Sequence, residues 1–349
     1  MHQFLKIVGN GQRTMRDLTL SEAQDAMELI MQGRANEVQM AAFMASLRIK
    51  EESAEELLAF TQVVRRYSQQ AAVRLPHSID LCVPYNGRTR TPLFQVASAI
   101  LAATCGAHVA LHGRIGQNTP PKFGVGAGDV LKVLGVPVDL PLDAAADMLQ
   151  ETHLAFIGVD QFAPRLEALH QMRLDYEMRS FFNTVEKLLN PFNAATAIIG
   201  IFHYPVMQRV AEIMQQLNYE RGLAVQGQEG AIDVVMTRRT PIMEFAPNAP
   251  QLRECAIDPQ NFGWWDGAHE NTTEITPQNQ AALTLQLLNP TPTVSPTFRR
   301  NLLLTAAMML YAAGLVTTLQ KGLTQAQNAL GNGRAQQHLE YLQKEAHHA

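Results

Sequence analysis

The sequence has few of the residues that hold a small covalently or metal-stabilised fold together. It contains only 3 cysteines in 349 residues, namely Cys82, Cys105 and Cys255. They are too few and too scattered for a disulfide framework or a zinc site. Such sparse cysteine usage is typical of a reducing compartment and predicts a cytoplasmic protein.

Charged residues and long apolar runs are scarce as well. Only 17% of the residues are charged, against a usual value of about 25%, whereas 46% are hydrophobic. This composition excludes a disordered chain and provides enough apolar surface for a large core. The most apolar run, residues 302–316, is shorter than the roughly 20 residues that a membrane-spanning helix needs. The first residues also lack the pattern of a signal peptide, so we expect no association with a membrane.

Neither sign of charge is in strong excess. Lys and Arg together number 28, Asp and Glu together 32, and the formal net charge is −4. This balance excludes a wholly basic nucleic-acid coat protein but leaves a local basic patch possible. At roughly 150 residues per domain, the length predicts about two domains.

The first 70 residues predict a small helical unit. Thr19 with Glu22, and Ser53 with Glu56, have the spacing of capping boxes, in which each side chain binds a free backbone N–H of the first helical turn. Apolar faces follow both signals, and Gly33 is a stop signal for the first helix. We therefore predict three amphipathic helices, over residues 20–32, 38–47 and 53–67.

From residue 79 onward, short apolar runs alternate with helical patterns, which is typical of parallel βαβ units. The predicted strands cover residues 79–83, 108–111, 155–159, 198–202, 223–225 and 232–236. The proline-rich segment 241–275 is predicted as a loop, and the chain ends in helices from residue 279. The expected architecture is α/β, with a small N-terminal α-helical domain (residues 1–75, to which later helical segments could add) and a large α/β domain with a mainly parallel central sheet (residues 76–349).

The loop after the first predicted strand is a candidate phosphate site. It contains Asn86, Gly87, Arg88, Thr89 and Arg90 between a strand and a helix, where α/β proteins bind anions. One glycine makes a poor backbone cradle, but two guanidinium groups can bind phosphate through paired hydrogen bonds. The alternative is an ordinary turn with two solvated arginines.

A second loop, after the next predicted strand, carries more positive charge. His112, Gly113 and Arg114 end that strand, and Lys122 follows in a loop with prolines and glycines. The cations could extend the candidate phosphate site. The alternative is that His112 has a structural role only.

Two later segments carry the remaining candidate ligands. Arg179 and Asn183 lie in a helix-like segment, where Arg179 could hold a carboxylate or a phosphate. Glu229 and Asp233 follow a predicted strand and could bind Mg²⁺, which prefers carboxylate oxygens. The alternatives are an amphipathic helix for the first segment and a turn with solvated acids for the second.

Taken together, the segments resemble the anthranilate phosphoribosyltransferase family along nearly the whole chain. Residues 179–183 with 188–191 (RSFFN and LLNP) are similar to its R-T-x-F-N…L-x-N-P pattern, and residues 257–263 (IDPQNFG) are similar to its L-D-P-x-x-F-G. The resemblance implies a helical domain packed on an α/β domain, a homodimer and an active site in the cleft. It also implies Mg²⁺-dependent transfer of the phosphoribosyl group of phosphoribosyl pyrophosphate (PRPP) to anthranilate, with Arg179 beside the anthranilate carboxylate.

The sequence departs from this family at the positions that bind PRPP. The family's G-T-G-G-D-G loop is replaced by residues 84–89 (PYNGRT), and its K-H-G-N stretch keeps His112 and Gly113 but has Leu111 and Arg114 outside them. Its D-E pair for magnesium is Ile232 followed by Asp233. These changes resemble a divergent, YbiB-type branch, whose members are described as binding nucleic acid.

Two hypotheses about function follow, and whether the protein is an enzyme stays open between them. The leading one is binding of single-stranded DNA or RNA, or another polyanion, through the cleft, without standard transferase activity, catalytic residues or a defined cofactor. The alternative is an active phosphoribosyltransferase that uses PRPP and Mg²⁺ with anthranilate or an altered aromatic or acidic acceptor. In that case Arg179 and Asn183 would hold the acceptor, and Glu229 and Asp233 the metal.

Overall fold

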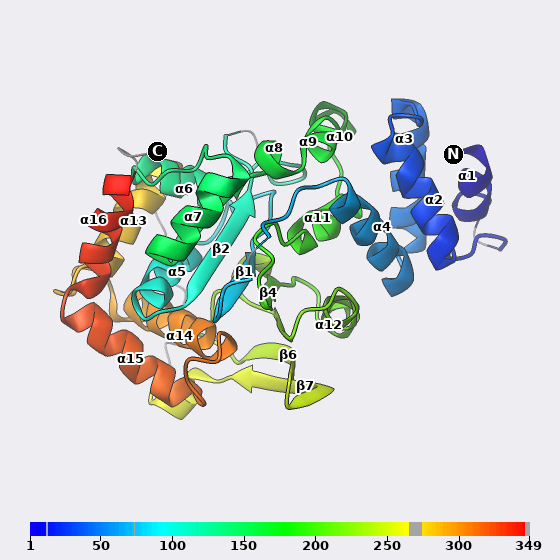
Figure 1. The fold of residues 1–349 in the computed structure, drawn as a ribbon. Coiled ribbons are helices and arrows are strands. Elements are labelled where there is room, and N and C mark those ends of the chain that lie inside the picture. Colours follow the sequence, from blue (N-terminus) through cyan, green and yellow to red (C-terminus); the bar gives the residue numbers. More distant parts are fainter. Residues whose placement is uncertain (12, 73, 117, 265–273, 346–349) are drawn as a thin grey trace.

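The computed structural model describes residues 1–11, 13–72, 74–116, 118–264 and 274–345. Its first four helices form a separate group at one end of the molecule, opposite the C-terminal helices (Figure 1). They are α1 (His2–Val8), α2 (Leu20–Met31), α3 (Glu37–Lys50) and α4 (Ala54–Arg66). The small N-terminal helical domain is therefore present as predicted, and the predicted boundary after residue 75 falls between α4 and the first strand.

The N-terminal helices begin where the capping signals place them. The side chains of Thr19 and Ser53 accept hydrogen bonds from the backbone N–H groups of Glu22 and Glu56, and both glutamates bind back to the capping residues. Both predicted capping boxes are confirmed. Asn36 caps α3 in the same way, with Gln39 as its partner, which the sequence analysis did not identify.

Removing the first of these caps tests its contribution to stability. Thr19→Ala is expected to lower the free energy of unfolding by about 1 kcal/mol, because a backbone N–H of the first turn loses its acceptor. Urea denaturation followed by circular dichroism measures the change. Ser21→Ala, at an exposed position of the same turn, is the control and should change stability by less than about 0.5 kcal/mol. Equal effects of the two substitutions would contradict the assigned role of Thr19.

The larger domain is built on one seven-stranded sheet with the strand order β3-β2-β1-β4-β5-β6-β7. The strands are β1 (Ser78–Cys82), β2 (His108–Gly113), β3 (Leu154–Gly158), β4 (Thr196–Gly200), β5 (Arg221–Val225), β6 (Thr240–Ala246) and β7 (Ala249–Ile257). Strands β1 to β5 pair in parallel, whereas β6 and β7 add antiparallel neighbours at one edge. Every residue of β1 to β4 is buried, as expected for parallel strands covered on both faces.

Helices cover this sheet and connect it to the helical domain. Helices α5 and α14 pack on each other, and α15 and α16 pack against them, while α12 contacts β5, β6 and also α4. The helices of this domain are α5 (Phe94–Thr104), α6 (Ala127–Val133), α7 (Leu142–Thr152), α8 (Val159–Phe162), α9 (Pro164–Glu167), α10 (His170–Tyr176), α11 (Phe182–Val185), α12 (Val206–Gln216), α13 (Pro277–Leu288), α14 (Pro296–Ala312), α15 (Leu319–Gly331) and α16 (Arg334–Glu345). Among the described residues, no helix is both long and apolar enough to span a membrane.

Two secondary-structure predictions are wrong. Residues 232–236 form no strand; their buried backbone is instead bound by side chains of α14, since Thr305 accepts from Val234 N–H and Asn301 donates to Val234 C=O. The segment 241–275 was predicted as a loop, but residues 240–257 form the β6–β7 hairpin; residues 265–273 of that prediction lie outside the described residues. The prolines of the hairpin stand where the ladder tolerates them, because Pro250 lies on the edge strand β7, Pro241 lies near the start of β6, and Pro247 lies in the turn between the two strands.

The two domains meet at an aromatic cluster. The ring of Phe181, just before α11, lies 6.2 Å from the ring of Phe43 in α3 and 4.6 Å from the ring of Phe60 in α4. These contacts fix the segment that carries Arg179 against the helical domain. On the outer part of α3, Val38 and Ile49 are exposed. The homodimer expected from the sequence stays a prediction.

Candidate anion-binding site

A small cavity lies at the carboxyl ends of β1 and β4. Chain connections leave the sheet in opposite directions from these two adjacent strands, and α/β proteins bind ligands at such switch points. Pro84 and Asn86 from the loop after β1, and Phe202 and His203 from the loop after β4, line the cavity. Its volume of about 70 Å³ accommodates on the order of five water molecules. It is therefore large enough for one phosphate or carboxylate group with its neighbouring atoms.

Three cationic side chains, Lys122, Arg179 and Lys187, reach this cavity from different loops. Arg179 is half-buried, and Lys187 is only 5% exposed. Within the described residues, neither has a carboxylate oxygen within 4.0 Å. A buried cation without a counter-ion is costly, so these two side chains make the cavity suited to an anion.

Lys187 is the most deeply buried of the three cations. Its ammonium group donates a hydrogen bond of 2.9 Å to the carbonyl of Gly200, at the end of β4. Burial, together with the nearby Arg179 charge, lowers the pKa of Lys187 to about 8. The amine is consequently charged at neutral pH but loses its proton in mildly alkaline solution.

Arg179 lies between the α/β domain and the helical domain. Burial and the charge of Arg48 lower its pKa, while Glu52 and Glu186 act in the opposite direction. Arg48 and Glu52 belong to the helical domain, at the end of α3 and just before α4. The guanidinium at the cavity is therefore held by the junction of the two domains.

Lys122 connects the cavity to Glu229. Its ammonium nitrogen lies 3.0 Å from Glu229 Oε1 and 3.2 Å from the Glu229 carbonyl oxygen. Burial lowers the pKa of Lys122. Burial alone would raise the pKa of Glu229, but the hydrogen bond and charge of Lys122, with Arg88 and the Thr89 N–H, lower it to about 2. Glu229 is therefore ionised throughout the physiological range.

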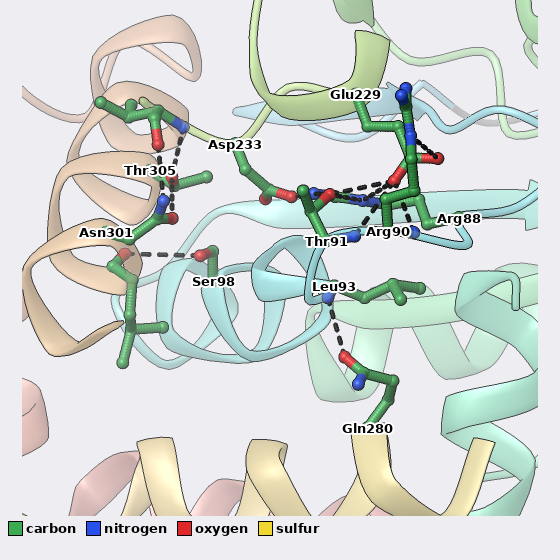
Figure 2. A network of polar contacts seen from close by, with 12 residues as sticks. Arg88, Arg90, Thr91, Leu93, Ser98, Glu229, Asp233, Gln280, Asn301 and Thr305 are labelled. Atoms are coloured by element: carbon green, nitrogen blue, oxygen red, sulfur yellow. Dashed lines mark hydrogen bonds and ion pairs between the residues drawn. The ribbon is translucent and has the colours of Figure 1, made fainter. Parts of the chain in front are cut away.

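Glu229 also binds the backbone of the loop after β1. Its carboxylate accepts hydrogen bonds from the N–H groups of Thr89, Arg90 and Thr91, at 3.2–3.3 Å. Figure 2 shows Glu229 beside Arg90 and Thr91. The loop is held from its other side by Gly87, whose φ of +65° and close approach to Gly124 leave no space for a Cβ. The loop after β1 thus surrounds a carboxylate of the protein itself.

Arg88 is buried in the same cluster. Its side chain is 0% exposed, and its Nη1 forms an ion pair with Asp233 Oδ2, while Nε donates to Thr91 Oγ1 at 3.1 Å (Figure 2). The second Asp233 oxygen, Oδ1, has no hydrogen-bond partner among the described residues. Burial raises the pKa of Asp233, against the lowering effect of Arg88. Arg88 is therefore an internal counter-ion, and its guanidinium is not presented to a ligand.

The carboxylates predicted to hold Mg²⁺ do not fit that ion. Both are present and close to the cavity loops, but Asp233 is paired with Arg88 and Glu229 with Lys122. Mg²⁺ needs free oxygen ligands, and these paired carboxylates do not offer them.

The structure separates the remaining predicted phosphate ligands. The side chain of Arg90 is 68% exposed, with its Nε 3.8 Å from Glu229. Arg114 forms a two-pronged ion pair with Glu167, so it does not face the cavity as an unpaired cation. Of the four cations that the sequence analysis placed in the cleft, only Lys122 lines the cavity.

His112 and Asn183 are engaged in contacts within the protein. His112 is fully buried; its Nδ1 lies 2.5 Å from the Tyr85 hydroxyl and its Nε2 3.1 Å from Asp80 Oδ1. The neighbouring Gly113 ends β2 and packs near Tyr85. Asn183 lines the cavity, but its amide bridges Ser180 N–H and the Pro120 carbonyl. Both side chains therefore position loops around the site.

Lys187, Phe202 and His203 are among the cavity residues that the sequence did not reveal. Lys187 lies in a stretch that was interpreted as an amphipathic helix, where a lysine is normally solvated. Phe202 was assigned to the end of a strand, yet β4 ends at Gly200 and the Phe202 ring is 46% exposed. The alternation of strands and helices could have revealed Phe202 and His203, because residues directly after a parallel strand tend to face the ligand site.

Comparison with known proteins identifies the family. The family model described as "Glycosyl transferase family, a/b domain" matches residues 93–336, and the model described as "Glycosyl transferase family, helical bundle domain" matches residues 2–68. The chain belongs to this glycosyl transferase family. Both matched segments agree with the two-domain architecture of the structure.

Two curated relatives of this glycosyl transferase family member share one name. The chain is 28% identical over 328 residues to the anthranilate phosphoribosyltransferase of Brevibacillus brevis, covering 94% of this chain and 93% of that protein. It is 29% identical over 334 residues to that of Paracidovorax citrulli, covering 95% and 94%. The protein is thus similar to anthranilate phosphoribosyltransferases over nearly its full length.

Solved structures show the same fold. The anthranilate phosphoribosyltransferase of Thermus thermophilus matches with a TM-score of 0.82 at 24% identity, covering 99% of this chain and all of that one. That of Saccharomyces cerevisiae, in complex with PRPP and Mg, matches with a TM-score of 0.80 at 16% identity, covering 100% and 98%. The predicted fold and superfamily are confirmed, while assignment to the YbiB-type branch stays a prediction.

Proposed function

We propose that this anthranilate phosphoribosyltransferase-like protein binds single-stranded nucleic acid, with one phosphate of the strand in the cavity at the β1 and β4 ends. On this proposal binding needs no divalent metal. The single observation that carries it is the pair Arg179 and Lys187, two buried or half-buried cations at one cavity without a carboxylate partner in the described part of the chain. A phosphate supplies the missing negative charge and accepts the hydrogen bonds that both groups can donate.

An exposed aromatic side chain at the cavity supports a nucleotide ligand. Phe202 lines the cavity and is 46% exposed, and Phe123, which follows Lys122, is 51% exposed. The ring of His203 packs edge-on against Phe202. Proteins that bind single strands combine a positively charged site with exposed rings on which bases stack. Overall acidity does not prevent such binding, because the cations act locally.

A binding experiment with a matched variant tests this function. A fluorescently labelled single-stranded oligonucleotide of about 12 nucleotides, within the usual site size, is titrated with protein in EDTA, for the wild type and for Phe202→Ala. We expect binding without metal and a loss of about 1–3 kcal/mol in the variant. Phe262→Ala serves as the control, since this ring lies in the segment after β7 and does not line the cavity. If Phe202→Ala binds the oligonucleotide as tightly as the wild type, the Phe202 ring does not contact the ligand.

The pH dependence of binding tests the role of Lys187. Because its pKa is about 8, the amine becomes neutral as the pH rises through 8, and anion affinity should fall by up to about tenfold per pH unit above that value. The Lys187→Met variant should bind more weakly at pH 7 and show a flatter profile. The pKa of Lys122 is lowered as well, so this comparison isolates the contribution of Lys187. Wild-type affinity that stays constant from pH 7 to pH 9 would contradict the assignment.

Phosphoribosyl transfer is a second candidate, and the relatives favour it. All the curated relatives cited above are named anthranilate phosphoribosyltransferases. In this chain Arg179 lines the cavity and could hold an acceptor carboxylate, as expected for anthranilate or another acidic aromatic acceptor. The paired carboxylates, by contrast, leave no fitting site for Mg²⁺.

An activity assay separates the two candidates. Protein is incubated with PRPP, Mg²⁺ and anthranilate, and consumption of anthranilate is followed by chromatography. On the binding proposal we expect no turnover above the protein-free control. Turnover that Arg179→Ala abolishes would establish the transferase candidate.

A further inference from the structure

The most unusual cluster beside the cavity is the charge network of Arg88, Lys122, Glu229 and Asp233, of which Lys122 and Glu229 also line the cavity. Two cations and two carboxylates balance each other, and the Arg88 and Asp233 side chains are fully buried. They come from three loops, which follow β1, β2 and β5 (Figure 2 shows Arg88, Glu229 and Asp233). The network therefore joins three loops of the site by charge.

We infer that the guanidinium of Arg88 is a built-in cation that takes the place of a divalent metal between Glu229 and Asp233. Its Nη1 contacts Asp233 Oδ2, and its Nε lies 4.0 Å from Glu229 Oε2. With Lys122 on the other Glu229 oxygen, the two side chains supply the charge that one divalent ion would supply. The inference concerns the loops around the cavity and does not depend on which ligand the cavity binds.

The carboxylates are fixed independently of the Arg88 side chain. The backbone next to Asp233 is held by α14, because Val234 N–H donates to Thr305 and the Val234 carbonyl accepts from Asn301, at 3.1 and 2.5 Å (Figure 2). Glu229 is held by three backbone N–H groups of the loop after β1. Removal of the guanidinium should therefore leave both carboxylates in place.

The loop that carries Arg88 is also held by its own backbone. Arg88 N–H donates to the Val125 carbonyl and Val125 N–H donates to the Arg88 carbonyl, both at 2.9 Å. Thr91 Oγ1 lies 3.1 Å from Glu229 Oε2 and within hydrogen-bond distance of the guanidinium. Truncating Arg88 thus opens a space bounded by carboxylate and hydroxyl oxygens, the ligands that Mg²⁺ and Mn²⁺ prefer.

The test measures whether Arg88→Ala creates a cation site. Binding of Mn²⁺ is measured from the electron paramagnetic resonance signal of the free ion, for wild type, R88A, R88A/D233N and the exposed control R90A. We expect R88A to bind one Mn²⁺ per chain at least about tenfold more tightly than wild type. The gain should be absent from R90A and lost in R88A/D233N, and Mn²⁺ should raise the melting temperature of R88A only.

Each other outcome contradicts the inference. A folded R88A that gains no Mn²⁺ affinity would overturn it, as would wild-type protein that binds Mn²⁺ as tightly as R88A. If R88A does not fold alone, we expect Mn²⁺ in the refolding buffer to restore cooperative unfolding, and failure to do so would overturn the inference too. The oligonucleotide titration of the wild type tests the proposed function, whereas Mn²⁺ binding by R88A tests this inference. Either one can therefore fail without the other.

Discussion

Replacing Asp233 with alanine is expected to lower the free energy of unfolding by about 3–5 kcal/mol, because the buried Arg88 guanidinium then loses its closest counter-charge. A charge that is fully buried cannot regain water without opening the loops around it. Urea denaturation monitored by circular dichroism measures the free energy of unfolding of the wild type and of Asp233→Ala. The expected loss is a large fraction of the stability of an ordinary domain.

Matched variants identify the cause of that loss. Arg90→Ala removes a neighbouring guanidinium that is 68% exposed, so it should change stability by less than about 0.5 kcal/mol. The double replacement R88A/D233A should cost less than the sum of the single ones, since it leaves no unpaired charge from this pair. Two results would contradict the pairing of Arg88 with Asp233. One is that the stability losses of the two single variants add up in the double variant, and the other is a loss below about 1 kcal/mol for Asp233→Ala.

Arg179→Ala is expected to weaken the binding of a phosphate-bearing ligand by about 1.5–3 kcal/mol, or roughly tenfold to 150-fold. Arg179 has no carboxylate partner in the described chain, so its donors are available to the ligand. For a nucleic-acid strand, the loss should be similar for all sequences and should reduce the salt slope by about 1. Fluorescence anisotropy at several salt concentrations measures both quantities.

Arg66→Ala is the control for this experiment. Arg66 forms an exposed ion pair with Glu28 on the helical domain and does not line the cavity. Its replacement should leave affinity within about twofold of wild type, because exposed pairs usually contribute only about 0–1 kcal/mol. If Arg179→Ala binds the ligand as tightly as the wild type, the ligand binds elsewhere on the protein.

Most of the fold could be predicted from the sequence because its signals are local. The capping residues Thr19 and Ser53 specify helix starts through contacts within one turn, and buried parallel strands show themselves as short apolar runs. Residues 232–236 have the same apolar composition, but the hydrogen bonds that hold them come from α14, some 70 positions away in the chain. A local pattern does not distinguish these cases.

The site was harder to predict, since charge availability depends on pairing between distant residues. Arg88 and Lys187 are both single basic residues in polar segments of the sequence. Arg88 is neutralised by Asp233, which lies 145 positions away, whereas the part of the chain that the structure describes offers Lys187 the Gly200 carbonyl and no carboxylate within 4.0 Å. Arg88, which the sequence predicted to bind phosphate, is therefore an internal counter-ion. Lys187, which the sequence analysis did not name, is the residue that needs an anion.

Titration of a labelled single-stranded oligonucleotide, followed by fluorescence anisotropy in EDTA and in Mg²⁺ at two salt concentrations, tests the central claim most directly. We expect binding that is equal in EDTA and Mg²⁺, falls steeply with salt, and is displaced by PRPP at the shared cavity. No binding in EDTA at low salt, with Mg²⁺-dependent binding of PRPP instead, would contradict it and favour a metal-dependent transferase.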